Sequence, residues 1–167
     1  LKNLKLLKKI KFDNTLFKAT HLSKKHFYVF TNKLLKIDID LNTTLTNLPN
    51  ELIDTKSIVV ESNFENLYIV SKTDGKLYEF SNKTFKKLAI LKGSIIQNLS
   101  FVDKKLWLAT TSGLFEYKNK AFINYYKDYN ISTIFKDREN KFWISTLTNG
   151  LFYTPNFSSI LWNCKNK

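Results

Sequence analysis

The stretch Phe142-Trp143-Ile144-Ser145-Thr146 decides the fold, because three earlier segments of the chain repeat its pattern. These are Phe27-Tyr28-Val29-Phe30-Thr31, Leu67-Tyr68-Ile69-Val70-Ser71 and Leu106-Trp107-Leu108-Ala109-Thr110. Each of the four is apolar, has an aromatic residue second and ends with a hydroxyl-bearing residue. Their starts at 27, 67, 106 and 142 lie 40, 39 and 36 residues apart. A period near 40 residues indicates a repeat fold, and four strands per repeat form a propeller blade.

Turn residues divide each repeat into four predicted strands, of which the quoted segment is the second. The first strands are expected at 16–21, 57–62, 95–102 and 132–137, and the fourth at 43–48, 85–91, 122–127 and 158–163. The third strand follows a turn containing Gly75, Gly113 or Gly150, or Asn32-Lys33 in repeat one. Glycine adopts the positive φ that tight hairpins require. The pattern therefore predicts an all-β chain built from four-stranded antiparallel blades.

The repeat register divides the chain into a β-propeller segment over 1–167. The expected ranges are an outer strand of a preceding blade at 1–11, then blades at 12–50, 51–93, 94–130 and 131–167. A helix over 4–10 is the alternative for the first range, since its leucines also have helical spacing. A closed four-bladed propeller is the alternative to a piece of a larger one. Two segments compete for one outer-strand position, which favours a piece of a larger propeller.

The formal net charge of +13 invites a nucleic-acid function, because lysines that neutralise phosphates drive such binding. Arg138 is the only arginine, however, and the lysines are spread over all four repeats. Base recognition and bidentate phosphate contacts favour arginine. A lysine- and asparagine-rich composition is also typical of an AT-rich genome. We expect no nucleic-acid partner, with an anion-binding surface as the alternative.

The residues that could carry catalysis or bind metal are few. Cys164 is the only cysteine, and the only histidines are His21 and His26. No thiolate cluster for zinc and no intrachain disulfide can therefore form. The acidic residues are scattered, with no evident pair for glycoside hydrolysis. We expect no catalytic residues, no metal and no cofactor. Apolar runs fall well short of the roughly 20 residues of a membrane-spanning helix.

Repeat four, residues 131–153, resembles the two-component regulator propeller repeat. That family's pattern is roughly an Ile-containing strand, Asp-x-x-Gly, an apolar-Trp-Ile-Gly-Thr strand and x-x-Gly-Leu. The matching residues are Asp137, Trp143, Ile144, Thr146, Gly150 and Leu151, while Asn140 and Ser145 replace two family glycines. Repeat three matches through Asp103, Trp107, Thr110, Gly113 and Leu114. Repeats one and two are more degenerate, with tyrosine at the Trp position.

The resemblance implies a role in signalling. Such repeats typically form paired seven-bladed propellers in the extracytoplasmic sensor of bacterial hybrid histidine kinases and related regulators, so the resemblance implies a larger, seven-bladed parent. Many of these systems respond to glycan breakdown products. Similar repeats also occur in surface or secretion-associated propellers without a kinase. Any kinase activity would lie in domains absent from this chain, and a membrane would be reached only through downstream segments. The resemblance thus implies a periplasmic or extracytoplasmic location in a bacterium.

Three functions remain open. The first is a ligand-sensing propeller that binds a small molecule or oligosaccharide through its loops. The second is a protein-interaction scaffold anchored by Tyr125, Tyr126 and Tyr129, and the third is an enzyme. The candidate ligand-binding residues are Lys72, Asp74, Thr111, Ser112, Thr148 and Asn149. The expected structural positions are Tyr28, Tyr68, Trp107, Trp143, Gly75, Gly113 and Gly150. The expected partners are the remaining blades of a parent propeller or a second copy.

Overall fold

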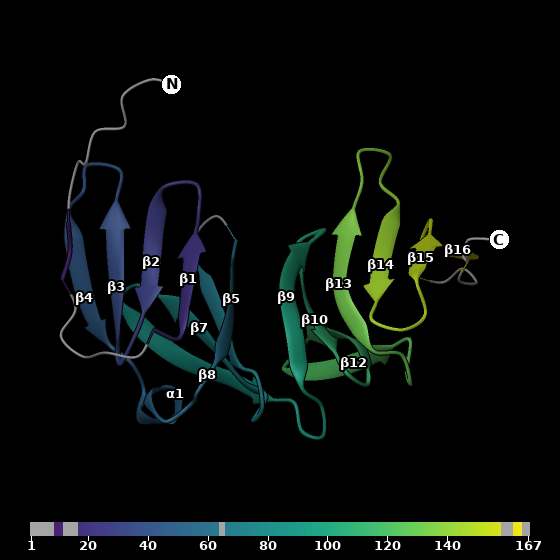
Figure 1. Cartoon of the computed structure of the whole chain (residues 1–167), viewed down its shortest axis with the longest axis horizontal. Coiled ribbons are helices and arrows are strands. Elements are labelled where there is room, and N and C mark those ends of the chain that lie inside the picture. Colours follow the sequence, from purple (N-terminus) through teal and green to yellow (C-terminus); the bar gives the residue numbers. More distant parts are fainter. Residues whose placement is uncertain (1–8, 12–16, 64–65, 158–161, 165–167) are drawn as a thin grey trace. The chain divides into compact units, whose positions relative to one another are not determined.

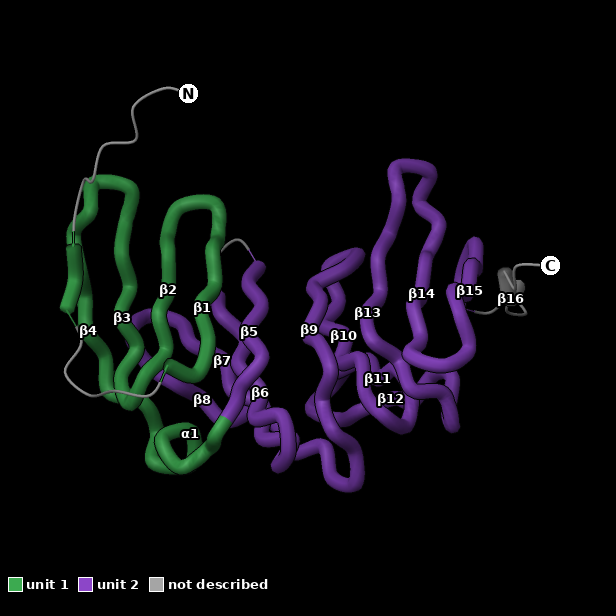
Figure 2. Tube along the Cα trace, viewed as in Figure 1, with its two compact units in different colours: residues 1–56 green, residues 57–167 purple. Residues whose placement is uncertain are grey.

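The computed structural model describes residues 9–11, 17–63, 66–157 and 162–164, which form almost only β-strands (Figure 1). Two compact units divide the chain, one of residues 1–56 and one of residues 57–167 (Figure 2). The elements of the first unit are β1 (Ala19–Leu22), β2 (His26–Phe30), β3 (Lys33–Asp38), β4 (Thr43–Asn47) and α1 (Asn50–Ile53). Those of the second are β5 (Ile58–Ser62), β6 (Leu67–Ser71), β7 (Lys76–Ser81), β8 (Thr84–Ile90), β9 (Ile96–Val102), β10 (Lys105–Thr110), β11 (Gly113–Lys118), β12 (Ala121–Tyr125), β13 (Ile131–Lys136), β14 (Phe142–Thr146), β15 (Leu151–Thr154) and β16 (Trp162–Cys164).

These strands form four antiparallel sheets of four consecutive strands each. We call them blade 1 (β1–β4), blade 2 (β5–β8), blade 3 (β9–β12) and blade 4 (β13–β16). The predicted all-β fold with four-stranded units is confirmed. The repeated segments are β2, β6, β10 and β14, the second strand of each blade. Successive side chains of a strand point to opposite faces of the sheet, and the second strands are nearly continuous in apolar residues, so both faces of a blade can be buried.

Several expected boundaries differ from the observed ones. β1 begins at Ala19 rather than residue 16, and β12 ends at Tyr125 rather than residue 127. The short helix α1 was not expected. Pro49 precedes it, Glu51 lies in its first turn and Leu52 is fully buried, so one apolar side chain anchors the connection after blade 1. Residues 1–8 and 158–161, which bear on the outer-strand predictions at both ends, lie outside the described residues.

Asparagine or aspartate followed by lysine closes three of the hairpins. The two-residue turns are Asn82-Lys83, Asp103-Lys104 and Asn119-Lys120. Both central residues have positive φ in every case, between 47° and 63°. That is the backbone requirement of a type I′ turn, whose twist matches the twist of paired strands. Blades 2 and 3 therefore turn without glycine at these places.

Within the second unit, β9 contacts both β5 and β13, as innermost strands of successive propeller blades do. Each blade has two faces. Blade 3 packs on blade 2 through one face, which we call its leading face, and on blade 4 through the other, its trailing face; the equivalent faces of the other blades take the same names. In blade 3, Leu99, Leu106 and Leu108 of the leading face join a core cluster with Val70 and Leu77 of blade 2. On the trailing face, Trp107 and Leu114 join a second cluster with residues of blade 4.

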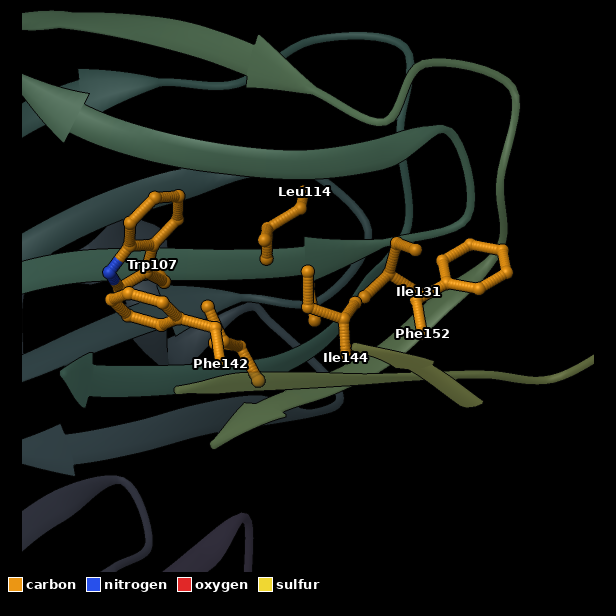
Figure 3. Packing of buried hydrophobic residues seen from close by; sticks show 8 residues of the cluster. Trp107, Leu114, Ile131, Phe142, Ile144 and Phe152 are labelled. Atoms are coloured by element: carbon orange, nitrogen blue, oxygen red, sulfur yellow. The ribbon is translucent and has the colours of Figure 1, made fainter. Parts of the chain in front are cut away.

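The cluster between blades 3 and 4 is built around Trp107, whose side chain is 1% exposed. Figure 3 shows the Trp107 ring next to Phe142, with Leu114, Ile131, Ile144 and Phe152 extending the apolar layer. Phe157 stacks on Trp107 with the ring centroids 4.5 Å apart. Polar contacts at the edges of this interface join Asn98 Nδ2 to Thr133 Oγ1 at 2.9 Å and Lys136 Nζ to Asp103 Oδ1 at 2.9 Å. Burial of large apolar side chains between sheets is the main source of stability here.

Candidate functional site

The predicted ligand-binding residues lie in the turns between the second and third strands of blades 2, 3 and 4. Lys72 and Thr111 are brought near each other by the segment that enters β9. The Ile96 N–H donates to the Lys72 carbonyl at 2.9 Å, and the Thr111 N–H donates to the Ile95 carbonyl at 3.1 Å. The turn with Thr148 and Asn149 is held inside its own blade. These turns stand at the same end of their blades.

Local hydrogen bonds occupy most of these side chains. Thr148 Oγ1 donates to Asn149 Oδ1 at 2.9 Å, and the Ser112 hydroxyl shares a hydrogen bond with that of Ser94. Asp74 Oδ2 lies 3.9 Å from Lys76 Nζ, and Asp74 is exposed. Self-bonding of Asp, Asn, Ser and Thr within turns is ordinary behaviour for these residues. Their role as ligand contacts stays a prediction.

A cleft of about 390 Å³ lies between blades 2 and 3, at the end opposite these turns. Its walls come from Tyr68 and Glu79 on the trailing face of blade 2 and from Phe101 and Tyr117 on blade 3. The Tyr68 and Phe101 rings are stacked, with centroids 6.0 Å apart and planes 6° from parallel. The exposed lysines of the lining are Lys104, Lys105 and Lys118. This volume is in the usual range for small-molecule sites.

Hydrogen bonds fix the polar groups of the cleft. Asn66 Nδ2 donates to Glu79 Oε1 at 2.7 Å, and Asn63 Nδ2 donates to the Tyr68 hydroxyl at 3.2 Å. Burial raises the pKa of the Tyr68 and Tyr117 hydroxyls above the usual value, and the negative charge of Glu79 raises both further. Both phenols therefore stay protonated at neutral pH and can donate hydrogen bonds. The cleft offers aromatic surface, a carboxylate acceptor and hydroxyl donors together.

Glu116 contributes to the lining, but its side chain belongs to the other face of blade 3. It pairs in register with Trp107, and the Tyr125 hydroxyl donates to its Oε2 at 3.0 Å. Lys105 Nζ lies 3.5 Å from Oε1, and Glu116 is nearly fully buried. Glu79 and Glu116 occupy equivalent positions on successive blades, with the sheet of blade 3 between them. A pair of carboxylates facing one substrate bond, which glycosidases need, is not formed by these two.

Sequence reasoning missed this cleft, although a signal was present. The third strands contain Leu77-Tyr78-Glu79-Phe80 and Leu114-Phe115-Glu116-Tyr117, so a carboxylate recurs on a face that buries an aromatic ring. A charged residue at a position expected to be apolar marks one of two things: a buried charge with a partner of opposite charge, or a binding or catalytic site. The structure assigns the first case to Glu116 and leaves Glu79 half-buried beside the cleft.

The structural repeat positions differ in burial. Tyr28 and Trp107 are buried, whereas Tyr68 and Trp143 are half-buried. The shared repeat position predicts that both tryptophans are mostly buried between adjacent blades. Trp107 is 1% exposed and packs against blade 4, whereas Trp143 is half-buried and its ring contact and hydrogen bond come from its own blade. Gly75, Gly113 and Gly150 all have positive φ. At Gly75 a Cβ atom would lie 1.9 Å from the Leu91 carbonyl oxygen, so the position needs glycine for space as well as conformation.

The tyrosines proposed as exposed anchors of a scaffold are not exposed. Tyr125, Tyr126 and Tyr129 are half-buried and pack against the cluster between blades 3 and 4. The Tyr129 ring meets Phe152 edge-on at 4.9 Å. These rings pack inward because the outer strand of blade 3 ends beside the Trp107 cluster. They stabilise the fold and are unavailable as a binding surface.

Within the described ranges, His, Cys, Asp and Glu side chains form no group of three or more that could hold a metal ion. The same part of the chain contains no helix of the length and apolarity that a membrane span requires.

Comparison with known proteins gives the fold. No family model and no curated protein matches the chain. Among solved structures, it is similar to the extracellular domain of the putative one component system BT4673 from B. thetaiotaomicron, with a TM-score of 0.70 and 13% identity over 98% of this chain and 24% of that one. The extracellular domain of the putative hybrid two component system BT3049 from the same organism matches with a TM-score of 0.58 and 22% identity, over 82% of this chain and 20% of that one.

An enzyme is also among the similar structures. Virginiamycin B lyase from Staphylococcus aureus matches with a TM-score of 0.66 and 12% identity, over 87% of this chain and 54% of that one. This chain spans between about a fifth and about half of the length of these three proteins. At such identities the likeness establishes the β-propeller fold and leaves function to the site itself.

Proposed function

We propose that this chain is a non-catalytic, ligand-binding segment of an extracytoplasmic sensor propeller of bacterial two-component type. The proposed ligand is a glycan fragment, and the proposed parent is a larger, seven-bladed propeller. The observation that carries the proposal is the cleft between blades 2 and 3, in which Tyr68, Phe101 and Glu79 meet. The fold-level likeness to extracellular domains of two-component regulators supports it.

The chemistry of the cleft suits a neutral sugar. Aromatic faces such as that of Tyr68 pack against the apolar C–H faces of a pyranose ring. The Glu79 carboxylate accepts hydrogen bonds from sugar hydroxyls, and the Tyr117 hydroxyl donates them. Lys104 and Lys118 extend the polar lining. The turn residues Lys72, Asp74, Thr111, Ser112, Thr148 and Asn149 remain the second proposed place of contact.

Calorimetric titration of the 167-residue chain with maltotriose, cellotriose, mannotriose and chitotriose tests the proposal. At least one trisaccharide is expected to bind, and Glu79→Gln is expected to weaken that binding about tenfold, the loss of roughly one charge-assisted hydrogen bond. Glu139→Gln, an exposed turn carboxylate of blade 4, is the matched control and should bind like the unchanged chain. Unchanged sugar would be recovered after long incubation, since no turnover is expected.

The outcome also separates the two places of contact. Weakened binding in Thr148→Ala with normal binding in Glu79→Gln would move the site to the turns. Absence of binding to all four trisaccharides would contradict the proposal that the ligand is a glycan fragment.

A protein-interaction scaffold of a surface or secretion-associated protein is the second candidate. The observation that favours it is the exposed apolar side chains of blade 4, where Phe135, Leu147 and Leu151 lie at the surface. They come from β13, from the turn after β14 and from the start of β15, and exposed large apolar side chains within one blade can mark an interaction surface. A protein partner that binds equally well to the chain and to Glu79→Gln would favour this function over sensing.

A further inference from the structure

The junction between blades 3 and 4 contains a filled counterpart of the cleft between blades 2 and 3. The repeat places Trp107 at the position of Tyr68 and Phe142 at that of Leu106. The ring of Phe157 lies against both, with its centroid 4.5 Å from that of Trp107 and 4.6 Å from that of Phe142. Tyr68 and Leu106 instead line the open cleft. A six-membered ring thus fills at one junction the place that stays open at the other.

The connection that carries Phe157 has no equivalent in blade 2. β15 ends at Thr154 and β16 begins at Trp162, so a long connection joins them. The two-residue turn Asn82-Lys83 joins β7 to β8. A turn of that length is too short to place a ring in the neighbouring junction. The cleft therefore remains open to a ring that a ligand supplies.

The two junctions also differ in charge. Lys104 and Lys118 line the cleft, and both are exposed. In the repeat alignment Lys104 corresponds to Asn140 and Lys118 to Pro155, which are both neutral. Among the residues that the structure describes, no carboxylate forms an ion pair with Lys104 or Lys118. The open junction thus has two positive charges that the filled junction lacks.

The other charges around the cleft are offset by partners. Lys86 lies directly opposite Glu79 in the register of β7 and β8, an arrangement in which opposite charges attract. Lys105 Nζ lies 3.5 Å from Glu116 Oε1. The two remaining lysines of the lining therefore give the cleft a net positive potential. Such a potential favours an anionic group on the ligand.

We propose that the ligand of the cleft carries a hexuronate residue, an inference that rests on the glycan function proposed above. Its pyranose ring takes the place that Phe157 takes at the next junction, and its carboxylate lies between Lys104 and Lys118. The ring hydroxyls, which a phenyl ring lacks, donate to Glu79 and accept from the Tyr117 hydroxyl. The contacts of a neutral ring are kept, and the carboxylate adds a charged contact.

Calorimetric titration of the 167-residue chain with matched pairs of trisaccharides tests the proposal. The pairs are mannotriose with trimannuronate, cellotriose with its C6-oxidised form, and α-1,4-galactotriose with trigalacturonate. Within a pair the linkage and ring stereochemistry are the same, and only the oxidation state of C6 differs. For at least one pair the acidic sugar should bind about tenfold more tightly at low salt. That advantage should fall below about twofold in 1 M salt, because the lysines are exposed.

Variants assign the charged contact to its residues. Lys104→Gln and Lys118→Gln should each reduce the advantage of the acidic sugar about threefold and leave binding of the neutral sugar unchanged. Lys127→Gln is the matched control, because Lys127 is an exposed lysine of the same blade outside the lining. Tyr68→Leu should weaken binding of both sugars by the same factor, since it removes ring contact and no charge.

The outcomes separate this inference from the function on which it rests. Equal affinity for the neutral and acidic members of every pair would overturn the hexuronate proposal and leave a glycan ligand in place. An acidic advantage that Lys127→Gln lowers as much as Lys104→Gln would also overturn it, because the attraction would then come from the overall charge of the chain. Absence of binding to every sugar would contradict both proposals.

Discussion

Trp107 and Trp143 occupy the same repeat position in neighbouring blades, but their surroundings differ. Trp107 is 1% exposed because Phe142 and Phe157 of the following blade and loop cover it. Trp143 is half-buried, and its contacts with Asp137 and Tyr153 come from its own blade. The repeat pattern predicts a large aromatic ring at this position. The buried fraction of that ring depends on whether a neighbouring blade packs against it. In repeat proteins stability divides between the unit and its interfaces in this way.

The largest expected effect is a difference between the two tryptophans. Trp107→Ala should lower the free energy of unfolding by about 3–5 kcal/mol, as expected for a large ring removed from a packed core. Trp143→Ala should lower it by less, by about 1–2 kcal/mol, because the ring is only partly buried and no described residue of another blade packs on it. Urea denaturation at low protein concentration measures both values.

Trp107→Phe and Trp143→Phe are the matched controls, since each keeps a ring and loses only part of the volume. Equal losses for the two alanine variants would mean that the neighbouring blade contributes little to the environment of Trp107.

A smaller effect is expected for the stacked pair at the other junction. Tyr68 and Phe101 come from blades 2 and 3, so a double-mutant cycle with leucine at both positions isolates their interaction across the junction. We expect a coupling energy of about 0.5–1.5 kcal/mol. Trp143 and Phe101, which belong to distant surfaces of blades 4 and 3, should show none in the same urea experiment. A coupling energy near zero for Tyr68 and Phe101 would mean that the stacked contact does not stabilise the junction.

The smallest expected effect concerns two aspartates near these rings. The Trp143 indole N–H, with the N–H groups of Lys141 and Glu139, lowers the pKa of Asp137. The hydrogen bond and charge of Lys136 lower the pKa of Asp103. A lowered folded-state pKa adds stability above the unfolded value near 3.9, and that stability is lost as the pH falls through the folded value. Asp137→Asn and Asp103→Asn should each flatten the loss of stability below about pH 4.

The stabilising interactions of Asp103 and Asp137 should differ in their dependence on salt concentration. The Asp103–Lys136 ion pair is exposed and should weaken in 1 M salt, whereas the hydrogen bonds of Asp137 should persist. Thermal unfolding at pH 7 with and without salt measures the difference. A salt response of Asp137→Asn as large as that of Asp103→Asn would assign both residues to ordinary surface charge.

Much of the fold could be predicted because its signals are local. The repeated segments became β2, β6, β10 and β14, and the glycine turns have the positive φ that was expected. The helix α1 escaped notice because four residues are too short for helical periodicity, and only Leu52 is buried. The half-buried state of Trp143 also escaped, since exposure depends on a neighbour that the local sequence does not describe.

The candidate site was harder to predict for a physical reason. The turn residues attract attention because polar loops carry function in many folds. The cleft instead combines Tyr68 and Glu79 of one blade with Phe101 and Tyr117 of the next. Their proximity follows from how two sheets pack, which no single repeat encodes. The glutamate that recurs in the third strand was the sequence signal for the cleft. Its two copies differ in surroundings, since Glu79 lies beside the cleft and Glu116 is buried on the other face of blade 3.

The Asn-Lys and Asp-Lys turns have a consequence for how the sequence can change over evolutionary time. Asn82-Lys83, Asp103-Lys104 and Asn119-Lys120 hold left-handed backbone without glycine. Asparagine and aspartate tolerate that conformation at modest cost, and the pairing of the flanking strands keeps lysine there too. Asparagine and lysine have codons made almost wholly of A and T, whereas glycine codons begin with two guanines. A shift of base composition towards A and T can therefore introduce asparagine and lysine at such turns while the hairpins keep their backbone conformation.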